Sequence, residues 1–120
     1  MAEVTDKYRG NKEYALAYAA LVMTARSRAM ITYRGIARLT GLPDEGQQMG
    51  KEVGHLLGEI SEDEHSRGRP MLSAIAVQKA TGRPGGEFYE FAGRLNKLKG
   101  DAPQSFWDTE VTKLYDFWDS

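Results

Sequence analysis

Residues 32–60 read TYRGIARLTGLPDEGQQMGKEVGHLLGEI, and this stretch decides which kind of fold the chain adopts. Thr32 stands where a helix N-cap is expected, and Gly41-Leu-Pro43 is a typical stop after a short helix. From Asp44 onward, apolar residues recur at three- and four-residue intervals, which predicts a second helix with one apolar face. That face consists of Met49, Val53, Leu56, Leu57 and Ile60. Two helices joined by a Gly-Pro turn predict a helix-turn-helix.

The segments on either side of this stretch extend the pattern. Upstream, Asn11 is placed to cap a longer helix, whose apolar stripe belongs in the core. The stripe consists of Tyr14, Tyr18, Leu21, Val22, Ala25 and Ala29. Downstream, the polar stretch 61–70 is expected to end the second helix, and the apolar run 71–78 reads as a buried strand. A turn at 81–86 follows, and residues 88–98 fit either a helix or, at their start, the returning strand of a hairpin.

The order of these elements predicts an α+β fold with a winged helix-turn-helix-like core at about 11–100. Its wing is expected to be a small β-hairpin, and an amphipathic helix at about 103–119 is expected to pack on this core. With 41% apolar and 28% charged residues, a chain of 120 residues is large enough to bury one core. We therefore expect a single domain spanning residues 1–120.

Composition excludes several classes of function. With no cysteine, the chain cannot form a disulfide or use a thiol as nucleophile, alkyl acceptor or metal ligand. Its formal net charge of −1 gives it no overall attraction to nucleic acid or to an anionic membrane. The longest uncharged apolar stretch, residues 14–23, is about half as long as a membrane-spanning helix needs. The polar N-terminus lacks a secretory-signal pattern, so we expect a cytoplasmic location and no membrane partner.

Acidic residues and two histidines gather between positions 55 and 65 and offer ligand types for a metal. They are His55, Glu59, Glu62, Asp63, Glu64 and His65. The two histidines lack any spacing typical of a metal site, so we expect a solvated acidic run, no metal and no cofactor. The glycine-rich segment 81–86 lacks the Lys-Ser/Thr ending of a nucleotide-binding loop, and we interpret it as a turn.

Several short motifs carry a resemblance to a known family. They are Ile31-Thr-Tyr-Arg-Gly-Ile-Ala37, Gly41-Leu-Pro43, Lys51-Glu-Val-Gly-His-Leu-Leu57, Pro70 before a strand and Thr81-Gly82 after it. Over residues 30–86, the chain resembles the DNA-binding half of the alkyltransferase family, which comprises the O6-alkylguanine transferases and the alkyltransferase-like proteins. The resemblance implies a winged helix that enters the minor groove and flips a base. It further implies that Tyr33 presses on the phosphate of the flipped nucleotide and that Lys51 replaces the arginine inserted into the vacated stack.

The chain departs from that family at the reactive position. The Pro-Cys-His-Arg motif is represented only by Pro70-Met-Leu-Ser73. Met71 cannot become a nucleophilic thiolate, and Leu72 supplies no base, so alkyl transfer is excluded. Four extra residues also separate Pro43 from Lys51. We therefore expect a protein that is not an enzyme.

The second helix offers polar side chains for reading double-stranded DNA. Its solvent side is expected to carry Gln47, Gln48, Lys51 and His55. Glutamine can pair with adenine, and lysine can pair with guanine or phosphate. The alternative is a solvated helix face, since Glu52 and Glu59 lie on nearly the same side and would repel phosphate.

The cations around the expected wing are the stronger argument for phosphate contact. Arg67 and Arg69 precede the predicted strand, and Lys79 and Arg83 flank the turn. We expect the segment carrying Lys51 and the loop carrying Arg83 to form one cationic surface. The full set of predicted DNA contacts is Tyr33, Arg34, Gln47, Gln48, Lys51, His55, Arg67, Arg69, Lys79 and Arg83.

The C-terminal helix supports an alternative function, that of an adaptor or inhibitor that binds another protein. Its aromatic residues exceed what one helix face buries against a small domain, and aromatic residues are favoured at interface cores. The predicted interface consists of Phe106, Trp107, Tyr115 and Trp118, and its partner is a second copy or another protein. Packing in the chain's own core is the other interpretation. The target of any binding, the pathway and the oligomeric state stay open at this level.

Overall fold

The computed structural model describes residues 5–98, 100 and 102–119. Within them, the elements in chain order are α1 (Lys12–Arg26), β1 (Ile31–Thr32), α2 (Tyr33–Thr40), α3 (Gly46–Ser66), the 3-10 helix η1 (Leu72–Ile75), β2 (Ala76–Val77), α4 (Gly86–Arg94) and α5 (Pro103–Trp118). The two strands pair in parallel, with Ile31 opposite Ala76. The protein is therefore mostly helical with a small two-stranded parallel sheet, in agreement with the predicted α+β class.

Local sequence signals place the starts and stops of the first helices. Asn11 is the N-cap residue of α1, as predicted, although its side chain donates to the Lys7 carbonyl instead of capping the helix. The Thr32 hydroxyl accepts a hydrogen bond from the Gly35 amide at 3.0 Å and so caps α2. Gly41 ends α2 in the left-handed conformation, with φ of 81°. Glycine adopts that conformation without steric cost.

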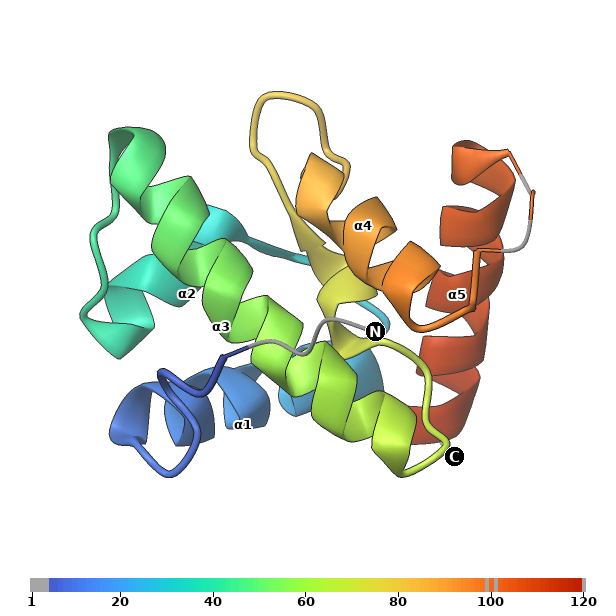
Figure 1. Cartoon of the computed structure of the whole chain (residues 1–120), viewed down its shortest axis with the longest axis horizontal. Coiled ribbons are helices and arrows are strands. Elements are labelled where there is room, and N and C mark those ends of the chain that lie inside the picture. The colour runs from blue at the N-terminus through green and yellow to red at the C-terminus, as the bar shows by residue number, and fades with distance from the viewer. Residues whose placement is uncertain (1–4, 99, 101, 120) are drawn as a thin grey trace.

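Helix α3 is the central helix and runs diagonally across the molecule in Figure 1. It begins at Gly46 instead of at Asp44, and it continues to Ser66. The prediction that residues 61–70 end this helix was therefore wrong for its first six positions. The acidic residues there stay helical because α1 and the N-terminal segment provide tyrosine and arginine partners for them, as described below.

The prediction of a strand over 71–78 was largely wrong as well. Residues Leu72–Ile75 form a 3-10 helix, and only Ala76 and Val77 are extended. All seven residues from Met71 to Val77 are buried. A short apolar run that is buried on every side has no periodicity that distinguishes a strand from a helical turn.

The predicted β-hairpin wing does not form among the described residues. Residues 88–91 lie in α4, so the helical alternative for this segment is correct and the returning strand is wrong. The loop 78–85 connects β2 directly to α4 and projects from the top of the molecule in Figure 1. Strand β2 pairs instead with β1, which precedes it in the chain.

The core lies where α1, α2, α3, η1 and α5 meet. On α1, Ala17, Leu21 and Ala25 are buried, and the larger Tyr14 and Tyr18 are half-buried at its edge. Ala29, predicted in this stripe, is exposed because α1 ends at Arg26. None of the helices in the described residues is long and apolar enough to cross a membrane.

Candidate functional site

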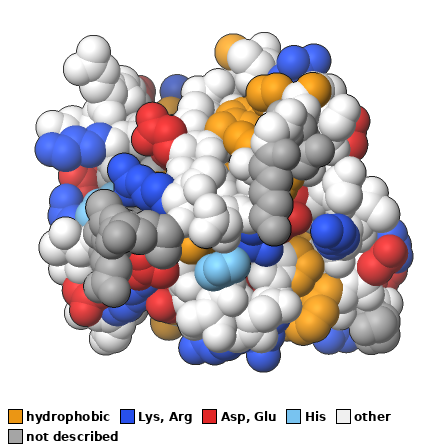
Figure 2. All heavy atoms as spheres, turned by 45° about the vertical axis from the view of Figure 1, so that its right-hand side comes forward, with side chains coloured by type: hydrophobic (Ala, Val, Ile, Leu, Met, Phe, Trp, Pro, Cys, Tyr) orange, Lys and Arg blue, Asp and Glu red, His pale blue; other side chains and the backbone are white. Residues whose placement is uncertain are grey.

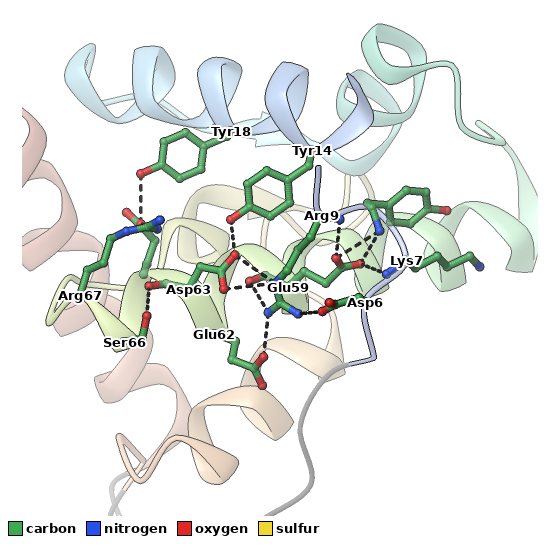
Figure 3. Close-up of polar contacts among 12 residues, drawn as sticks. Asp6, Lys7, Arg9, Tyr14, Tyr18, Glu59, Glu62, Asp63, Ser66 and Arg67 are labelled. Atoms are coloured by element: carbon green, nitrogen blue, oxygen red, sulfur yellow. Dashed lines mark hydrogen bonds and ion pairs between the residues drawn. The ribbon is translucent and has the colours of Figure 1, made fainter. Parts of the chain in front are cut away.

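The N-terminal arm, residues 5–11, lies along α3 and is anchored by one buried carboxylate (Figure 3). Glu59 has no exposed surface. It accepts hydrogen bonds from the backbone amides of Tyr8 at 3.0 Å and of Arg9 at 2.8 Å, and the Lys7 amide lies 3.3 Å away. A buried carboxylate requires such donors because desolvation of an unpaired charge is costly. The prediction that Glu59 faces solvent was therefore wrong.

Arg9 of the arm connects three further acidic side chains (Figure 3). Its Nη2 donates to Glu62 at 2.7 Å, its Nε lies 3.1 Å from Asp63, and its Nη1 pairs with Asp6. The Tyr14 hydroxyl from α1 donates to the same Asp63 at 2.6 Å. Burial and this hydrogen bond raise the pKa of Tyr14.

The remaining acidic side chains of α3 are engaged in the same way. Glu52 accepts hydrogen bonds from the Lys7 ammonium at 2.6 Å and from the Tyr8 hydroxyl. Glu64 is buried and accepts from the Tyr18 hydroxyl at 3.0 Å and from Arg67 at 3.2 Å. All five carboxylates of α3 therefore interact with the arm, with α1 or with the following loop.

The first two turns of α3 differ from the rest of the helix. Gln47, Gln48 and Lys51 are exposed, and positions 46–51 contain no acidic residue. The carboxylates of α3 all lie further along the helix, and the nearest of them, Glu52, is engaged by Lys7 and Tyr8. Positions 46–51 therefore present amide groups, a cation and the positive end of the helix dipole, and the exposed N-cap residue Glu45 is the acidic side chain next to them.

A groove of about 720 Å³ lies between the start of α3 and the loop 78–85. We call it the α3–loop groove. Tyr33 and Arg34 border it from α2, Gly46, Met49 and Gly50 from α3, and Gln78, Lys79 and Ala80 from the loop. Its lining is mainly apolar, its cations, Arg34 and Lys79, are exposed, and its one acidic residue, Glu87, is half-buried and accepts a hydrogen bond from Tyr33.

Two smaller hollows adjoin this groove. The first, of about 520 Å³, shares Gly50 and Glu87 with it and is bordered by Lys51, His55, Arg94 and the exposed Glu90. The second, of about 420 Å³, shares Gln78 with it and is bordered by Arg83. Lys51 and Arg83 thus border hollows on the two sides of one groove, and both side chains are exposed.

Comparison with known proteins adds no further information. No protein-family model, curated protein or solved structure matches this chain. The resemblance to the alkyltransferase family stays a prediction, and the site has to be interpreted from its own geometry.

Tyr33 is buried, unlike a side chain that presses on a phosphate at the surface. Its hydroxyl donates to Glu87 and accepts the Gly85 amide at 3.3 Å. Burial, and then the bond to Glu87, raise the pKa of Tyr33. His55 is also partly enclosed, with Nε2 2.7 Å from the Thr5 carbonyl oxygen and 3.3 Å from Glu59. Tyr33 therefore forms part of the floor of the α3–loop groove, and His55 helps to hold the arm.

Arg67 and Arg69 lie at the opposite end of α3 from the α3–loop groove. Both approach the buried Glu64, at 3.2 and 3.6 Å, and Arg69 also stacks near the Trp118 ring of α5. The structure therefore does not bring them together with Lys79 and Arg83. The strand expected to join the two pairs is replaced by the buried segment 71–77.

The aromatic residues predicted as a protein interface pack mostly against the chain itself. Phe106 and Trp107 are buried, and the Trp107 indole donates to the Ala74 carbonyl at 2.8 Å. The Tyr115 hydroxyl donates to the Ala29 carbonyl at 2.7 Å, and Trp118 is half-buried. Figure 2, which brings the side of α5 forward, shows charges of both signs interspersed around small apolar areas.

No three His, Asp or Glu side chains in the described part of the chain are grouped so as to hold a metal ion. The arm and the glycine-lined start of α3 were not predicted from the sequence. Two signals were present. Basic residues at 7 and 9 complement the acidic ones at 52, 62 and 63, and glycines recur at 46, 50, 54 and 58.

Proposed function

We propose that the protein binds double-stranded DNA without catalysing a reaction. In this proposal, α2 and α3 form a helix-turn-helix, and the loop 78–85 takes the place of the wing. The observation that carries it is the separation of charge along α3. Its five carboxylates are engaged with the arm, α1 and the following loop, and positions 46–51 at its start are mostly exposed and contain no acidic residue.

Of the five exposed cations around the α3–loop groove and its neighbouring hollows, we assign four to phosphate contact. They are Arg34, Lys51, Lys79 and Arg83. Cations fix the position of a protein on the phosphate backbone, and side chains that reach base edges read the sequence. Gln47 and Gln48 are the exposed amides next to these cations, so we assign base contact to them.

Binding of labelled duplex, measured by fluorescence anisotropy, tests this proposal. Four phosphate contacts predict that affinity falls about a hundredfold between about 50 and 200 mM salt. The double variant Lys51→Ala/Lys79→Ala should bind at least about tenfold more weakly and reduce the salt slope by about 2. Lys113→Ala, which removes an exposed cation from α5, is the matched control. Equal affinity of the double variant and the wild type would rule out the proposed surface.

The alternative function, a protein-interaction module using α5, receives less support. Phe106 and Trp107 are needed in the core, and Asp116 and Asp119 form ion pairs with Arg28 at 3.1 and 2.7 Å. A salt-independent complex with another protein that is lost in a Tyr115→Ala variant would favour this alternative over DNA binding.

A further inference from the structure

The carboxylate of Glu87 forms no ion pair with any residue that the structure describes. Glu87 belongs to the first turn of α4, and its Oε1 accepts a hydrogen bond from the Tyr33 hydroxyl. The side chain is half-buried, and the positive end of the α4 dipole offsets its charge only in part. A carboxylate that is partly removed from water and lacks a cationic partner favours a cationic ligand.

Two glycines leave room for this carboxylate. A Cβ at Gly85 would lie 2.7 Å from Oε2 of Glu87, and a Cβ at Gly54 would lie 3.2 Å from its Oε1. A larger residue at position 85 would therefore displace the carboxylate. Glu87 borders both the α3–loop groove and the neighbouring hollow near Lys51, so a ligand in the groove can reach this side chain.

The rest of the α3–loop groove provides apolar walls and a cationic rim. Met49 borders it from α3 and Ala80 from the loop, and its volume of about 720 Å³ lies in the range of small-molecule sites. Arg34 and Lys79 are its exposed cations. The Arg34 Nε donates to the Asp44 carbonyl at 3.1 Å, which holds the guanidinium group at the rim. Because these cations repel a ligand with positive charge alone, a ligand that pairs with the floor must also carry an acidic group.

We propose that the α3–loop groove binds a small guanidino acid, a class for which L-arginine is the probe. The guanidinium group of the ligand pairs with the Glu87 carboxylate on the floor of the groove. Its aliphatic stem lies against Met49 and Ala80, and its carboxylate contacts Arg34 and Lys79 at the rim. Both charges of the ligand then meet the opposite charge in the groove.

The acceptor positions left on Glu87 favour a guanidinium group over other donors. The Tyr33 hydroxyl uses one position on Oε1, and Oε2 accepts no hydrogen bond from the residues that the structure describes. A planar guanidinium presents parallel N–H donors that match two carboxylate oxygens, whereas an ammonium group acts as a point charge. A neutral group with similar donors, such as a ureido group or the edge of guanine, would leave the charge of Glu87 uncompensated.

Isothermal titration calorimetry of the 120-residue chain with L-arginine tests this site without DNA. We expect a Kd on the order of 100 µM. L-Citrulline has the same stem and carboxylate but a neutral ureido group, and it should bind at least about tenfold more weakly. Agmatine keeps the guanidinium group but lacks the carboxylate, and it should bind about threefold more weakly, because the rim contact is exposed to solvent.

Variants at the floor and at the rim test the two contacts separately. Glu87→Gln should bind L-arginine at least about tenfold more weakly and should no longer distinguish it from L-citrulline. The glutamine oxygen can still accept the hydrogen bond from Tyr33, and thermal unfolding checks that the fold is intact. Glu90→Gln, at an exposed carboxyl group of the same helix, is the matched control and should leave the Kd unchanged. Arg34→Ala should weaken L-arginine about threefold and leave agmatine no weaker.

Three results would overturn the proposal. The first is a Kd for L-arginine above about 5 mM, and the second is equal affinity of Glu87→Gln and the wild type for L-arginine. The third is L-citrulline or guanosine monophosphate binding as tightly as L-arginine, since the charge of the donor group would then not be recognised. Loss of duplex binding with intact binding of L-arginine would contradict the proposed function alone.

Discussion

Glu59 shows how much one side chain determines in this protein. Its carboxylate fixes the backbone of the arm through the amides of Tyr8 and Arg9, and the arm in turn provides Lys7 and Arg9 for other carboxylates of α3. Sequence periodicity could not assign this role, because a glutamate on the polar side of a helix normally faces water. The identity of its partners depended on a chain segment fifty positions away.

Glu59→Gln should lower the free energy of unfolding by about 3 kcal/mol, because the amide loses the charge and turns N–H groups toward the arm's own N–H donors. Urea denaturation measures the change. Glu45→Gln, at an exposed position, is the control for a carboxyl-to-amide substitution. A Glu59→Gln variant within about 0.5 kcal/mol of the wild type would contradict the anchoring role of this carboxylate.

At the scale of elements, the glycines of α3 divide the helix into a packed half and an open half. A Cβ at Gly58 would lie 2.4 Å from the Phe91 ring of α4, whereas a Cβ at Gly50 would meet nothing within 4 Å. Close approach of α4 therefore requires glycine at 58. At 50, the missing side chain leaves the α3–loop groove open.

These two glycines provide a matched pair of substitutions in one helix. Gly58→Ala should destabilise the protein by about 2 kcal/mol, because the methyl group overlaps the half-buried Phe91 ring. Gly50→Ala should stabilise it by about 0.5–1 kcal/mol, because alanine favours the helix. Thermal unfolding of both variants measures the difference. Equal effects of the two substitutions would contradict the packing of α4 on α3.

Elements with strong local signals were predictable. The short helix α2 was predicted from Thr32 and Gly41, and the C-terminal helix from Pro103, since caps and proline act on the adjacent backbone alone. The end of α3 and the buried segment 71–77 were not predictable, because contacts with segments distant in the sequence determine their structure. Within the candidate site, the exposure of Lys51 and Lys79 was predicted. The burial of Tyr33, whose hydroxyl donates to Glu87, was not predicted.

At the scale of the whole molecule, the contact between arm and α3 makes stability depend on pH. Hydrogen bonds from Lys7 and Tyr8 hold the pKa of Glu52 below its ordinary value. A carboxyl group whose pKa is lowered by folding stabilises the fold fully above its unfolded pKa. That contribution is lost as the pH falls through the folded value.

The free energy of unfolding should therefore be constant near neutral pH and decrease below about pH 4. Glu52→Gln should make this decrease less steep, and Glu90→Gln serves as the control at an exposed carboxyl group. Urea denaturation at a series of pH values measures both slopes. A Glu52→Gln variant as acid-sensitive as the wild type would show that the contact with the arm does not contribute.

The parallel pairing of Ile31 with Ala76 also constrains the order in which the chain folds. It closes a loop that contains both α2 and α3, so its closure entropy is far larger than that of a hairpin. We expect the helices to condense first and this contact to form late, on the native side of the kinetic barrier. Substitutions at Ile31 should then accelerate unfolding and leave the refolding rate nearly unchanged.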